Sequence, residues 1–431
     1  MAKPGMIAAV KGFRDVLPDE SRRWQALEET AVALFGRYGF GELRLPILER
    51  TDLFARSLGE TTDVVEKEMY SFLDRDETSV TLRPEATAGA VRAYLETGLA
   101  QRDPSARLFY RGPMFRRERP QRGRYRQFYQ LGAEVFGRHD PLADAELLVM
   151  LQRYLAAVRA RGTMLQLNSV GDATCRPAYR ERLREFGRHH LDALCPDCHR
   201  RLERNPLRIF DCKVESCRAV VERAPLVLQH LCEPCRDHFA EVRRLLDQEG
   251  VPYESNPRLV RGLDYYVRTA FEIVAEGLGA QNAVGGGGRY DGLVAALGGP
   301  DVPGVGFAIG VERLAMTVGD EVDAGAPGPA AMILPLEDRA IAPALRLATR
   351  LRDEGLAVDL EPAGRSLKAL LRAADRRRAR LAVILGDDEL RSGRATVRDL
   401  VRREDRPQAL ALDASGVELA RAVQALVENG R

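Results

Sequence analysis

The stretch RGPMFRRERPQRGRYRQFYQLGAEVFG, residues 111–137, predicts an antiparallel hairpin, and the rest of the chain is organised around it. Residues 108–115 are apolar and aromatic enough to form a strand. Residues 129–135 alternate with period two, so that Leu131 and its apolar neighbours face one way while Gln130 and Glu134 face the other. A proline and a glycine between the two segments interrupt any regular element there.

The turn of this hairpin is strongly basic, with six arginines and one acidic residue, Glu118, between residues 116 and 126. Arginine binds phosphate through two parallel hydrogen bonds and keeps its charge at any working pH, which suits a polyphosphate or a nucleic-acid end. A run of charge is also common on a solvated loop. The polar face beside the turn, where Gly132 separates Gln130 from Glu134, leaves space for a small polar ligand against the backbone and favours a binding site.

Length and charge limit the remaining possibilities. A chain of 431 residues exceeds one ordinary core, so two or three domains are expected. The 65 basic and 63 acidic residues nearly cancel, so any RNA contact must come from local patches instead of a global field. No segment resembles the apolar run of a signal peptide or reaches the length of a membrane span, which predicts a cytoplasmic protein without membrane contact.

The segment before the hairpin predicts a helix, a short strand and a polar turn. Apolar residues recur on one helical face from Trp24 to Tyr38, and residues 43–45 form a strand that stops at Pro46. Such a pair often builds a dimer interface, although the pattern alone is more typical of core packing. If the strand at residues 79–87 keeps its geometry, Glu85 and Thr87 face the same side and could hold an ammonium group; a surface turn explains them equally well.

Residues 172–250 are mostly helical, rich in arginine, and contain all seven cysteines. Cys195 and Cys198 form one C-x2-C pair, and Cys232 and Cys235 form a second. Disulfides are not expected in a cytosolic chain, and four thiolates at this spacing can complete one tetrahedral zinc site. The alternative is a set of buried free thiols.

Two glycine-rich stretches follow the insertion. Residues 258–272 predict two strands and a turn with the adjacent tyrosines Tyr265 and Tyr266, and residues 285–292 read GGGGRYDG. Four consecutive glycines bring the backbone against something flat, because only glycine tolerates such an approach. Further glycines at residues 304–310 lead into a helix with Arg313 in its first turns, but their spacing is not that of the dinucleotide-binding fingerprint.

The last hundred residues predict a separate domain. Residues 323–328 are typical of a linker, and beyond them strands alternate with helices, which implies a parallel sheet. Between residues 365 and 380, seven basic residues stand against one acid, Asp375. This patch is either a solvated helix face or the contact surface of an RNA-binding domain.

Together these stretches resemble the class II aminoacyl-tRNA synthetases, and among them the bacterial histidyl-tRNA synthetases, over nearly the whole chain. The helix and strand ending at Pro46 resemble motif 1 of the class, Phe115-Arg116-x-Glu118 motif 2, and Gly310-x-Glu312-Arg313 motif 3. LVRGLDYY (residues 259–266) and GGGGRYDG resemble stretches specific to the histidine enzymes.

The resemblance implies an α+β catalytic domain built on an antiparallel sheet over residues 1–325, with a helical, cysteine-rich insertion at about 172–250. It also implies a C-terminal α/β anticodon-binding domain over residues 330–431. The implied reaction is the ATP-dependent, magnesium-assisted activation of L-histidine and its transfer to the 3′ end of tRNA(His). Known members of the family are homodimers.

The resemblance also assigns roles to individual residues. Arg116 and Arg313 match the arginines that hold the α- and γ-phosphates of ATP, and Glu118 and Arg124 match its other contacts in motif 2. Arg261 matches an arginine that takes the place of a metal ion at the α-phosphate, so Arg261 and Arg116 are the expected catalytic residues. The expected histidine-binding residues are Glu85, Thr87, Gln130, Glu134, Tyr265, Tyr266 and Tyr290. Those expected at the tRNA acceptor end are Arg119 and Gln121.

Two other functions compete with this reading. A paralogue of the fold serves as a regulatory subunit of ATP phosphoribosyltransferase and binds histidine without activating it, but it typically lacks the C-terminal domain and the catalytic arginines. A stand-alone RNA-binding or stress-sensing module would not require an intact GGGGRYDG stretch. The defining motifs do not include the cysteine pairs, so the resemblance leaves the zinc question open.

Overall fold

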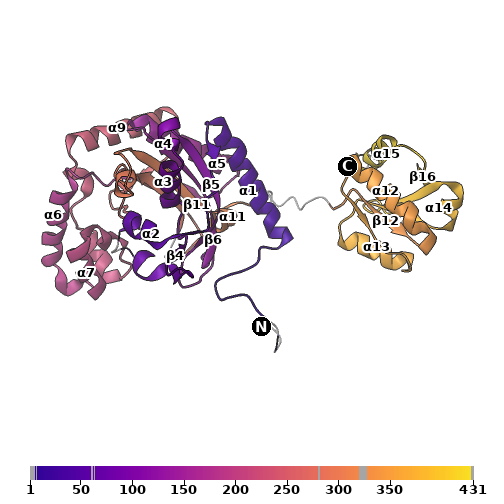
Figure 1. Ribbon diagram of the computed structural model, residues 1–431, viewed down its shortest axis with the longest axis horizontal. Coiled ribbons are helices and arrows are strands. Elements are labelled where there is room, and N and C mark those ends of the chain that lie inside the picture. Colours follow the sequence, from indigo (N-terminus) through magenta and orange to yellow (C-terminus); the bar gives the residue numbers. More distant parts are fainter. Residues whose placement is uncertain are drawn as a thin grey trace. The chain divides into compact units, whose positions relative to one another are not determined.

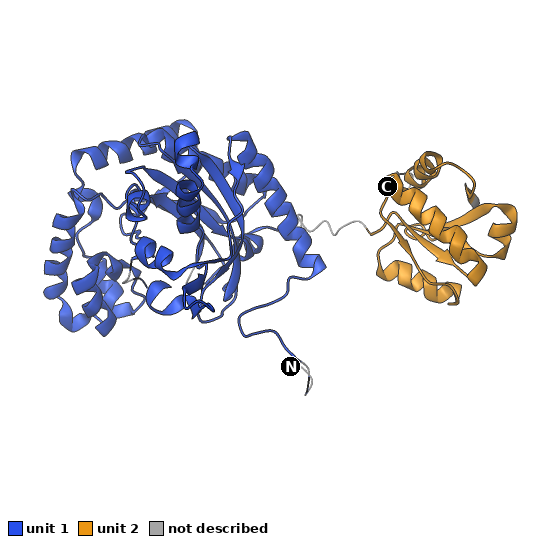
Figure 2. Cartoon of the chain, in the orientation of Figure 1, with its two compact units in different colours: residues 1–322 blue, residues 323–431 orange. Residues whose placement is uncertain are grey.

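The computed structural model describes residues 5, 7–59, 62, 64–279, 282–319 and 328–428. The chain divides into two units, Met1–Val322 and Asp323–Arg431, each with its own sheet and hydrophobic core (Figure 2). The linker predicted at residues 323–328 lies outside the described residues except for Gly328. Among the described helices, none combines the length and the apolar character needed to cross a bilayer.

The N-terminal unit is built on an eight-stranded sheet with the order β1-β5-β6-β11-β10-β9-β7-β8. Neighbouring strands are antiparallel except in the outer pairs β1–β5 and β7–β8. The strands are β1 (Gly41–Glu42), β5 (Arg107–Phe115), β6 (Gln127–Phe136), β7 (Thr163–Ser169), β8 (Glu254–Ser255), β9 (Val267–Ala275), β10 (Ala283–Arg289) and β11 (Gly304–Gly310). The antiparallel sheet predicted for this part of the chain is confirmed.

The basic stretch forms the predicted hairpin, in which β5 pairs with β6 from Arg107↔Val135 to Phe115↔Gln127. On β6, Leu131 and its apolar neighbours are buried in the main core, whereas Gln130 lines a pocket on the other face. A shift of one residue in the pairing would exchange these two faces, so the alternation of the sequence fixes the register.

Helices cover the apolar face of the sheet and pack against one another (Figure 1). They are α1 (Pro18–Arg37), α5 (Pro141–Ala157), α9 (Glu233–Gln248) and α11 (Val311–Thr317). The helical face predicted for α1 is confirmed, because Trp24, Leu27 and Phe35 are buried in the main core.

The strand predicted at residues 43–45 is displaced, since β1 ends at Glu42 and strand geometry resumes only at β2 (Leu48–Arg50). The cause is Arg83, a buried arginine whose Nη1 donates to the carbonyls of Leu45 at 2.8 Å and Pro46 at 3.2 Å. A side chain thus takes the acceptors that a neighbouring strand would use, and Pro46 has no N–H for a ladder.

A smaller antiparallel sheet, β2-β4-β3, belongs to the same unit. Its other strands are β3 (Tyr70–Leu73) and β4 (Ser79–Leu82). The short helical elements of this unit are α2 (Thr51–Leu58), the π-helical turn η1 (Val64–Glu68), α3 (Thr87–Glu96), α4 (Leu99–Arg102) and α10 (Leu293–Ala296). Helix α3 follows β4 after a short turn, and this turn brings Glu85 to the pocket.

The cysteine-rich segment is helical, as predicted, and has a hydrophobic cluster of its own around Tyr179, Leu183 and Ile209. Its elements are α6 (Arg176–Arg188), η2 (Leu191–Ala193), α7 (Pro196–Arg204), η3 (Pro206–Asp211), α8 (Glu215–Val221), η4 (Val227–His230) and α9. Helix α9 carries the chain back to the main core, where Phe239, Val242 and Leu246 are buried.

The C-terminal unit has a five-stranded sheet with the order β13-β12-β14-β15-β16. Its elements are β12 (Ala331–Pro335), η6 (Asp338–Ala340), α12 (Ile341–Asp353), β13 (Val358–Leu360), α13 (Leu367–Arg376), β14 (Leu381–Leu385), α14 (Asp387–Ser392), β15 (Arg394–Asp399), β16 (Glu404–Ala411) and α15 (Gly416–Glu428). The predicted parallel sheet is correct for β13, β12 and β14 but wrong for β15 and β16, which are antiparallel. Only residues 400–403 separate β15 from β16, too few for a parallel crossover.

Candidate active site

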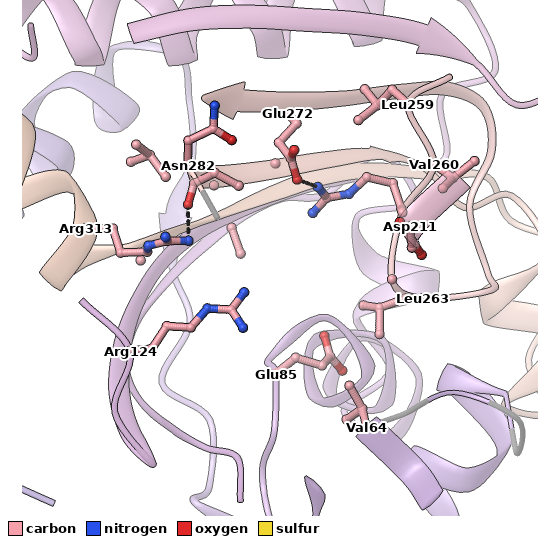
Figure 3. Close-up of a pocket in the computed structure, with 18 of the residues that line it drawn as sticks. Val64, Glu85, Arg124, Asp211, Leu259, Val260, Leu263, Glu272, Asn282 and Arg313 are labelled. Atoms are coloured by element: carbon pink, nitrogen blue, oxygen red, sulfur yellow. Dashed lines mark hydrogen bonds and ion pairs between the residues drawn. The ribbon is translucent and has the colours of Figure 1, made fainter. Parts of the chain in front are cut away.

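An open pocket of about 870 Å³ lies on the polar face of the large sheet. Strands β6, β10 and β11 contribute its floor, and its walls come from the start of α3, the turn after β5 and residues 210–213 and 258–266 (Figure 3). The pocket therefore collects segments from the whole N-terminal unit. It contains acidic groups and several arginines, which lie at different places along it.

A buried carboxylate lies beneath one end of the pocket. Glu134 accepts hydrogen bonds from Thr87 Oγ1 at 2.8 Å, Tyr110 OH at 3.0 Å and Tyr290 OH at 2.5 Å. Burial raises the pKa of Glu134 to about 8, against the opposing effect of these hydroxyl donors. The buried site therefore favours the protonated form of this carboxyl group more than water does.

A second buried acid, Glu85, lines the pocket at the start of α3. The expected strand geometry is wrong here, because Thr87 is the first residue of α3. The two side chains are nevertheless brought together: Glu85 accepts from the backbone N–H groups of Thr87 at 2.6 Å and Ala88 at 2.9 Å. Burial raises the pKa of Glu85, while these N–H donors oppose the shift.

Three more predicted residues complete this end of the pocket. Gln130, Tyr265 and Tyr266 line it, and the two tyrosine rings lie 4.6 Å apart between centroids. Gln130 Oε1 is buried and accepts no hydrogen bond from any residue that the structure describes. A buried acceptor in a pocket that Glu85 also lines is suited to a ligand that carries hydrogen-bond donors and positive charge.

The glycines of β10 and β11 form a floor on which functional side chains rest directly. A Cβ atom at Gly286 would lie 2.8 Å from Arg261 Cζ, and one at Gly288 would lie 2.9 Å from Tyr266 Cδ1. At Gly306 a Cβ atom would overlap the Glu134 carboxylate. The flat group predicted to lie against the glycine run is therefore in part the planar guanidinium of Arg261. It can lie this close to the strand only because glycine has no side chain.

Arginines from the β5–β6 turn and from α11 also face the pocket, and Arg116 adjoins the acidic end, because its Nε donates to the Pro84 carbonyl at 2.8 Å. Arg124 donates to Glu118 at 2.5 Å, Arg116 Nη1 lies 4.0 Å from the same carboxylate, and the Arg116 guanidinium lies over the Phe128 ring. Arg313, from α11, donates to the Ala283 carbonyl at 2.5 Å. Burial lowers the pKa of Arg313, and the charge of Arg124 adds to this effect. Figure 3 shows both side chains on the same side of the pocket. Guanidinium groups collected in this way favour a polyanion.

The predicted acceptor-end residues lie outside the pocket. Arg119 and Gln121 are exposed in the hairpin turn, where Gln121 and Arg124 exchange backbone hydrogen bonds of 3.1 and 2.9 Å. The same turn thus carries two exposed residues outside the pocket and, on either side of them in the sequence, the pocket-lining arginines Arg116 and Arg124.

Sequence reasoning missed two groups of charged residues. Glu272 lines the pocket and pairs with Arg261 Nη1 at 2.6 Å. Arg289, inside the GGGGRYDG stretch, is fully buried and donates to the Asp144 carboxylate from Nε at 3.1 Å. The only sequence signal for this buried pair was the position of an arginine directly after four glycines. Asp144 gave no signal, because it belongs to a distant helix whose amphipathic pattern does not distinguish it.

The zinc site predicted from four cysteines is wrong as a grouping. Cys195 and Cys198 come together with Cys212 and Cys217, whereas Cys232 and Cys235 come together with Cys175 and Asp172. Within each group the possible ligand atoms all lie within 4.8 Å of one another. The two C-x2-C pairs begin different helices, α7 and α9, so each pair is completed by residues near its own helix.

Comparisons with known proteins match this arrangement. Residues 12–314 match the family model described as histidyl-tRNA synthetase, and residues 330–427 match the anticodon binding domain. The histidine–tRNA ligase of Geobacter metallireducens is 53% identical over 393 residues, which cover 91% of this chain and 95% of that protein. That of Syntrophotalea carbinolica is 48% identical over 425 residues and 99% of both chains.

A solved structure supports the same assignment. The apo histidyl-tRNA synthetase of S. aureus superposes with a TM-score of 0.77 and 34% sequence identity, covering 93% of this chain and 97% of that one. The match includes the catalytic family model, the anticodon-binding model and relatives at about half identity over most of the chain. The chain therefore belongs to the histidyl-tRNA synthetase family.

Proposed function

We propose that the chain is a cytoplasmic histidine–tRNA ligase that condenses L-histidine with ATP to histidyl-adenylate and transfers the histidyl group to the 3′ end of tRNA(His). The observation that carries this proposal is a single pocket with an acidic end, where Glu85 lines it and Glu134 is buried, and an arginine-rich end with Arg124 and Arg313. Arg116 adjoins the acidic end through the Pro84 carbonyl, and Arg261 lies on the glycine floor. An amino acid with a basic side chain fits the first end and a polyphosphate fits the second.

At the acidic end, we assign Glu85, Thr87 and Gln130 to the ammonium group of histidine, and Glu134, Tyr265, Tyr266 and Tyr290 to its imidazole. A neutral imidazole presents one donor and one acceptor, so a carboxyl group and a phenol can read both ring nitrogens. The raised pKa of Glu134 suits this task, because the group can accept or donate a hydrogen bond near neutral pH. An amino acid without such a ring would leave the buried polar groups unpaired.

At the other end, we assign Arg116, Arg124, Arg313 and Glu118 to ATP. The carboxylate of histidine attacks the α-phosphorus, the bond to the bridging oxygen breaks, and pyrophosphate leaves. The protein supplies mainly positioning and charge stabilisation, for which Arg261 and Arg116 are placed. ATP is used with Mg²⁺, which supplies charge neutralisation to the departing pyrophosphate.

The proposed partners are tRNA(His) and a second copy of the chain. Arg119 and Gln121, exposed on the hairpin turn, are proposed to meet the acceptor end, and the C-terminal unit the anticodon. A homodimer would cover the apolar side chains of Leu48, Phe72 and Leu73, which are exposed on the small sheet. Thiolate clusters in the insertion further suit structural zinc, a cofactor distinct from the magnesium of the reaction.

Histidine-dependent exchange of pyrophosphate into ATP, measured beside the other amino acids, tests the proposal. Exchange with histidine, followed by transfer to tRNA(His), is expected. Histidine binding without exchange would instead favour the regulatory-subunit function. Exchange with a different amino acid alone would overturn the assignment of the acidic end of the pocket.

A further inference from the structure

We propose that the insertion binds two structural zinc ions, one held by Cys195, Cys198, Cys212 and Cys217 and one by Asp172, Cys175, Cys232 and Cys235. All seven cysteines of the chain fall into these two groups, four in the first and three in the second. Cysteines that served only as small apolar residues would be distributed through a core, without regard to the number of ligands that a metal requires.

The first group, the four-cysteine centre, has distances that suit zinc. Cys195 Sγ lies 3.8 Å from Cys212 Sγ, close to the separation of about 3.8 Å that tetrahedral ligands have when Zn–S bonds are about 2.3 Å long. The backbone N–H of Cys195 donates to Cys217 Sγ at 3.1 Å. Such N–H donors stabilise a thiolate and orient it, as the outer partners of metal ligands commonly do.

The second group, the aspartate centre, has the same plan with one oxygen ligand. Cys175 Sγ lies 4.0 Å from Cys235 Sγ, and Asp172 Oδ1 lies 3.7 Å from the sulfurs of both Cys175 and Cys232. The backbone N–H of Asp172 donates to Cys175 Sγ at 3.4 Å. Asp172 is half-buried, and its other carboxylate oxygen lies 3.6 Å from Arg268 Nη2, which leaves Oδ1 directed at the sulfurs. Zinc accepts thiolate and carboxylate ligands together.

Both centres use a helix start in the same way. Cys195 and Cys232 are the N-cap residues of α7 and α9, and Cys198 and Cys235 lie in the first turn of those helices. The unpaired N–H groups and the positive end of the dipole favour a thiolate at this place. The remaining ligands then come from the segments that precede or follow each helix, which explains why the two pairs do not share a metal.

The positions of the two centres connect them to the pocket. In the four-cysteine centre, Cys212 itself lines the pocket with its neighbours Asp211 and Lys213. In the aspartate centre, the turn after β7 is tied to the pocket segment: Gly171 accepts from Arg268 N–H at 2.8 Å, and Arg176 donates to the Tyr266 carbonyl. Loss of the metal at the aspartate centre is therefore expected to shift Tyr266. The consequence for histidine binding rests on the function proposed for that residue.

The number of zinc ions bound per chain distinguishes two separate centres from a single one. Purified full-length protein is expected to hold two zinc ions per chain by plasma mass spectrometry. Cys217→Ser and Cys175→Ser should each hold one, and the double variant none. A single site made by the two C-x2-C pairs predicts the reverse: these variants would keep all their metal, and Cys198→Ser alone would remove it. That result, iron in place of zinc, or metal-free protein would overturn the proposal.

A second measurement does not depend on the folding of variants. Zinc removed from the wild-type protein by a chelator and replaced with Co²⁺ should give tetrahedral cobalt–thiolate absorption that saturates at two equivalents. Saturation at one equivalent, or titration of fewer than seven free thiols in the denatured, metal-free protein, would contradict two thiolate centres. Metal stoichiometry is independent of ligase activity, so failure of the proposed reaction would leave this result unchanged.

The connection to the pocket has its own test. With equal thermal stability, Cys175→Ser is expected to raise the KM for histidine in the exchange reaction several-fold more than it changes kcat. An unchanged KM in a protein that has lost one zinc would show that the aspartate centre stabilises the insertion without positioning Tyr266.

Discussion

Replacing Gly286 with alanine should slow the proposed ligase reaction by displacing Arg261. Neither Gly286 nor the added methyl group has a reactive atom of its own. A Cβ atom at this position would lie 2.7 Å from Arg261 Nη1 and 2.8 Å from Arg261 Cζ, whereas ordinary contacts begin at 3.4 Å. The guanidinium must therefore retreat by about 0.6 Å from its present position. Since a misplacement of about 1 Å can cost roughly a hundredfold in rate, we expect kcat to fall by about ten- to a hundredfold.

The same methyl group would also lie 2.6 Å from the carbonyl oxygen of Phe271, so some of the strain falls on the sheet. A mutant cycle separates the two effects. Arg261→Ala should itself cost on the order of a hundredfold or more in kcat and leave histidine binding largely intact, because it removes one donor to the developing charge. If Gly286→Ala acts by displacing Arg261, adding it to Arg261→Ala should have little further effect on kcat.

The assay is histidine-dependent pyrophosphate exchange, with thermal unfolding measured on each variant. Gly292→Ala is the matched control, because no atom lies within 4 Å of the position of its Cβ. Its kcat should equal that of the wild type. Equal losses of kcat from Gly286→Ala with and without Arg261 would refute the reasoning and place the whole effect in the sheet.

Three further changes test other parts of the molecule. Glu134→Gln should raise the KM for histidine at least tenfold in the exchange assay, because an amide does not ionise and so cannot place negative charge beside the imidazole. An unchanged KM would show that Glu134 does not take part in histidine binding. Asp144→Asn should lower the free energy of unfolding by about 3–5 kcal/mol, since it leaves Arg289 buried without its main partner. Burial alone would raise the pKa of Asp144, but Arg289 and His238 hold it at about 2, so the wild type should lose about 2 kcal/mol of stability as the pH falls from about 4 to 2, and the difference between the two proteins in denaturant unfolding should narrow there. Neutralising Arg365, Lys368 and Arg372 should weaken tRNA binding and flatten its salt dependence, because fewer counterions are released; identical slopes would place the RNA contact elsewhere.

The hairpin and its two faces could be predicted because they depend on local alternation. The period-two pattern around Leu131 and the turn residues are contained within one stretch, and no distant residue opposes them. The strand at residues 43–45 could not be predicted correctly, because the guanidinium of Arg83 takes the carbonyl groups of Leu45 and Pro46 at its end. A buried arginine from another segment leaves no trace in the local pattern.

The same distinction applies to the site. The motifs identified the pocket-lining arginines and acids, because their spacing resembles a family. Sequence alone did not reveal that Glu272 holds Arg261, or that Cys212 and Cys175 join different cysteine pairs. Such partnerships depend on the packing of helices and strands that lie far apart along the chain, and seven cysteines allow several groupings of equal plausibility.

The glycine floor has a consequence for how this protein can change over evolutionary time. Where a pocket is lined by side chains, single substitutions can enlarge or reshape it in small steps. Here the floor is already the smallest that a chain can provide, and every methyl group added at Gly286, Gly288 or Gly306 meets Arg261, Tyr266 or Glu134. Variation toward another amino acid, in nature or in a selected library, must therefore begin in the wall segments at residues 258–266 and in the turn before α3.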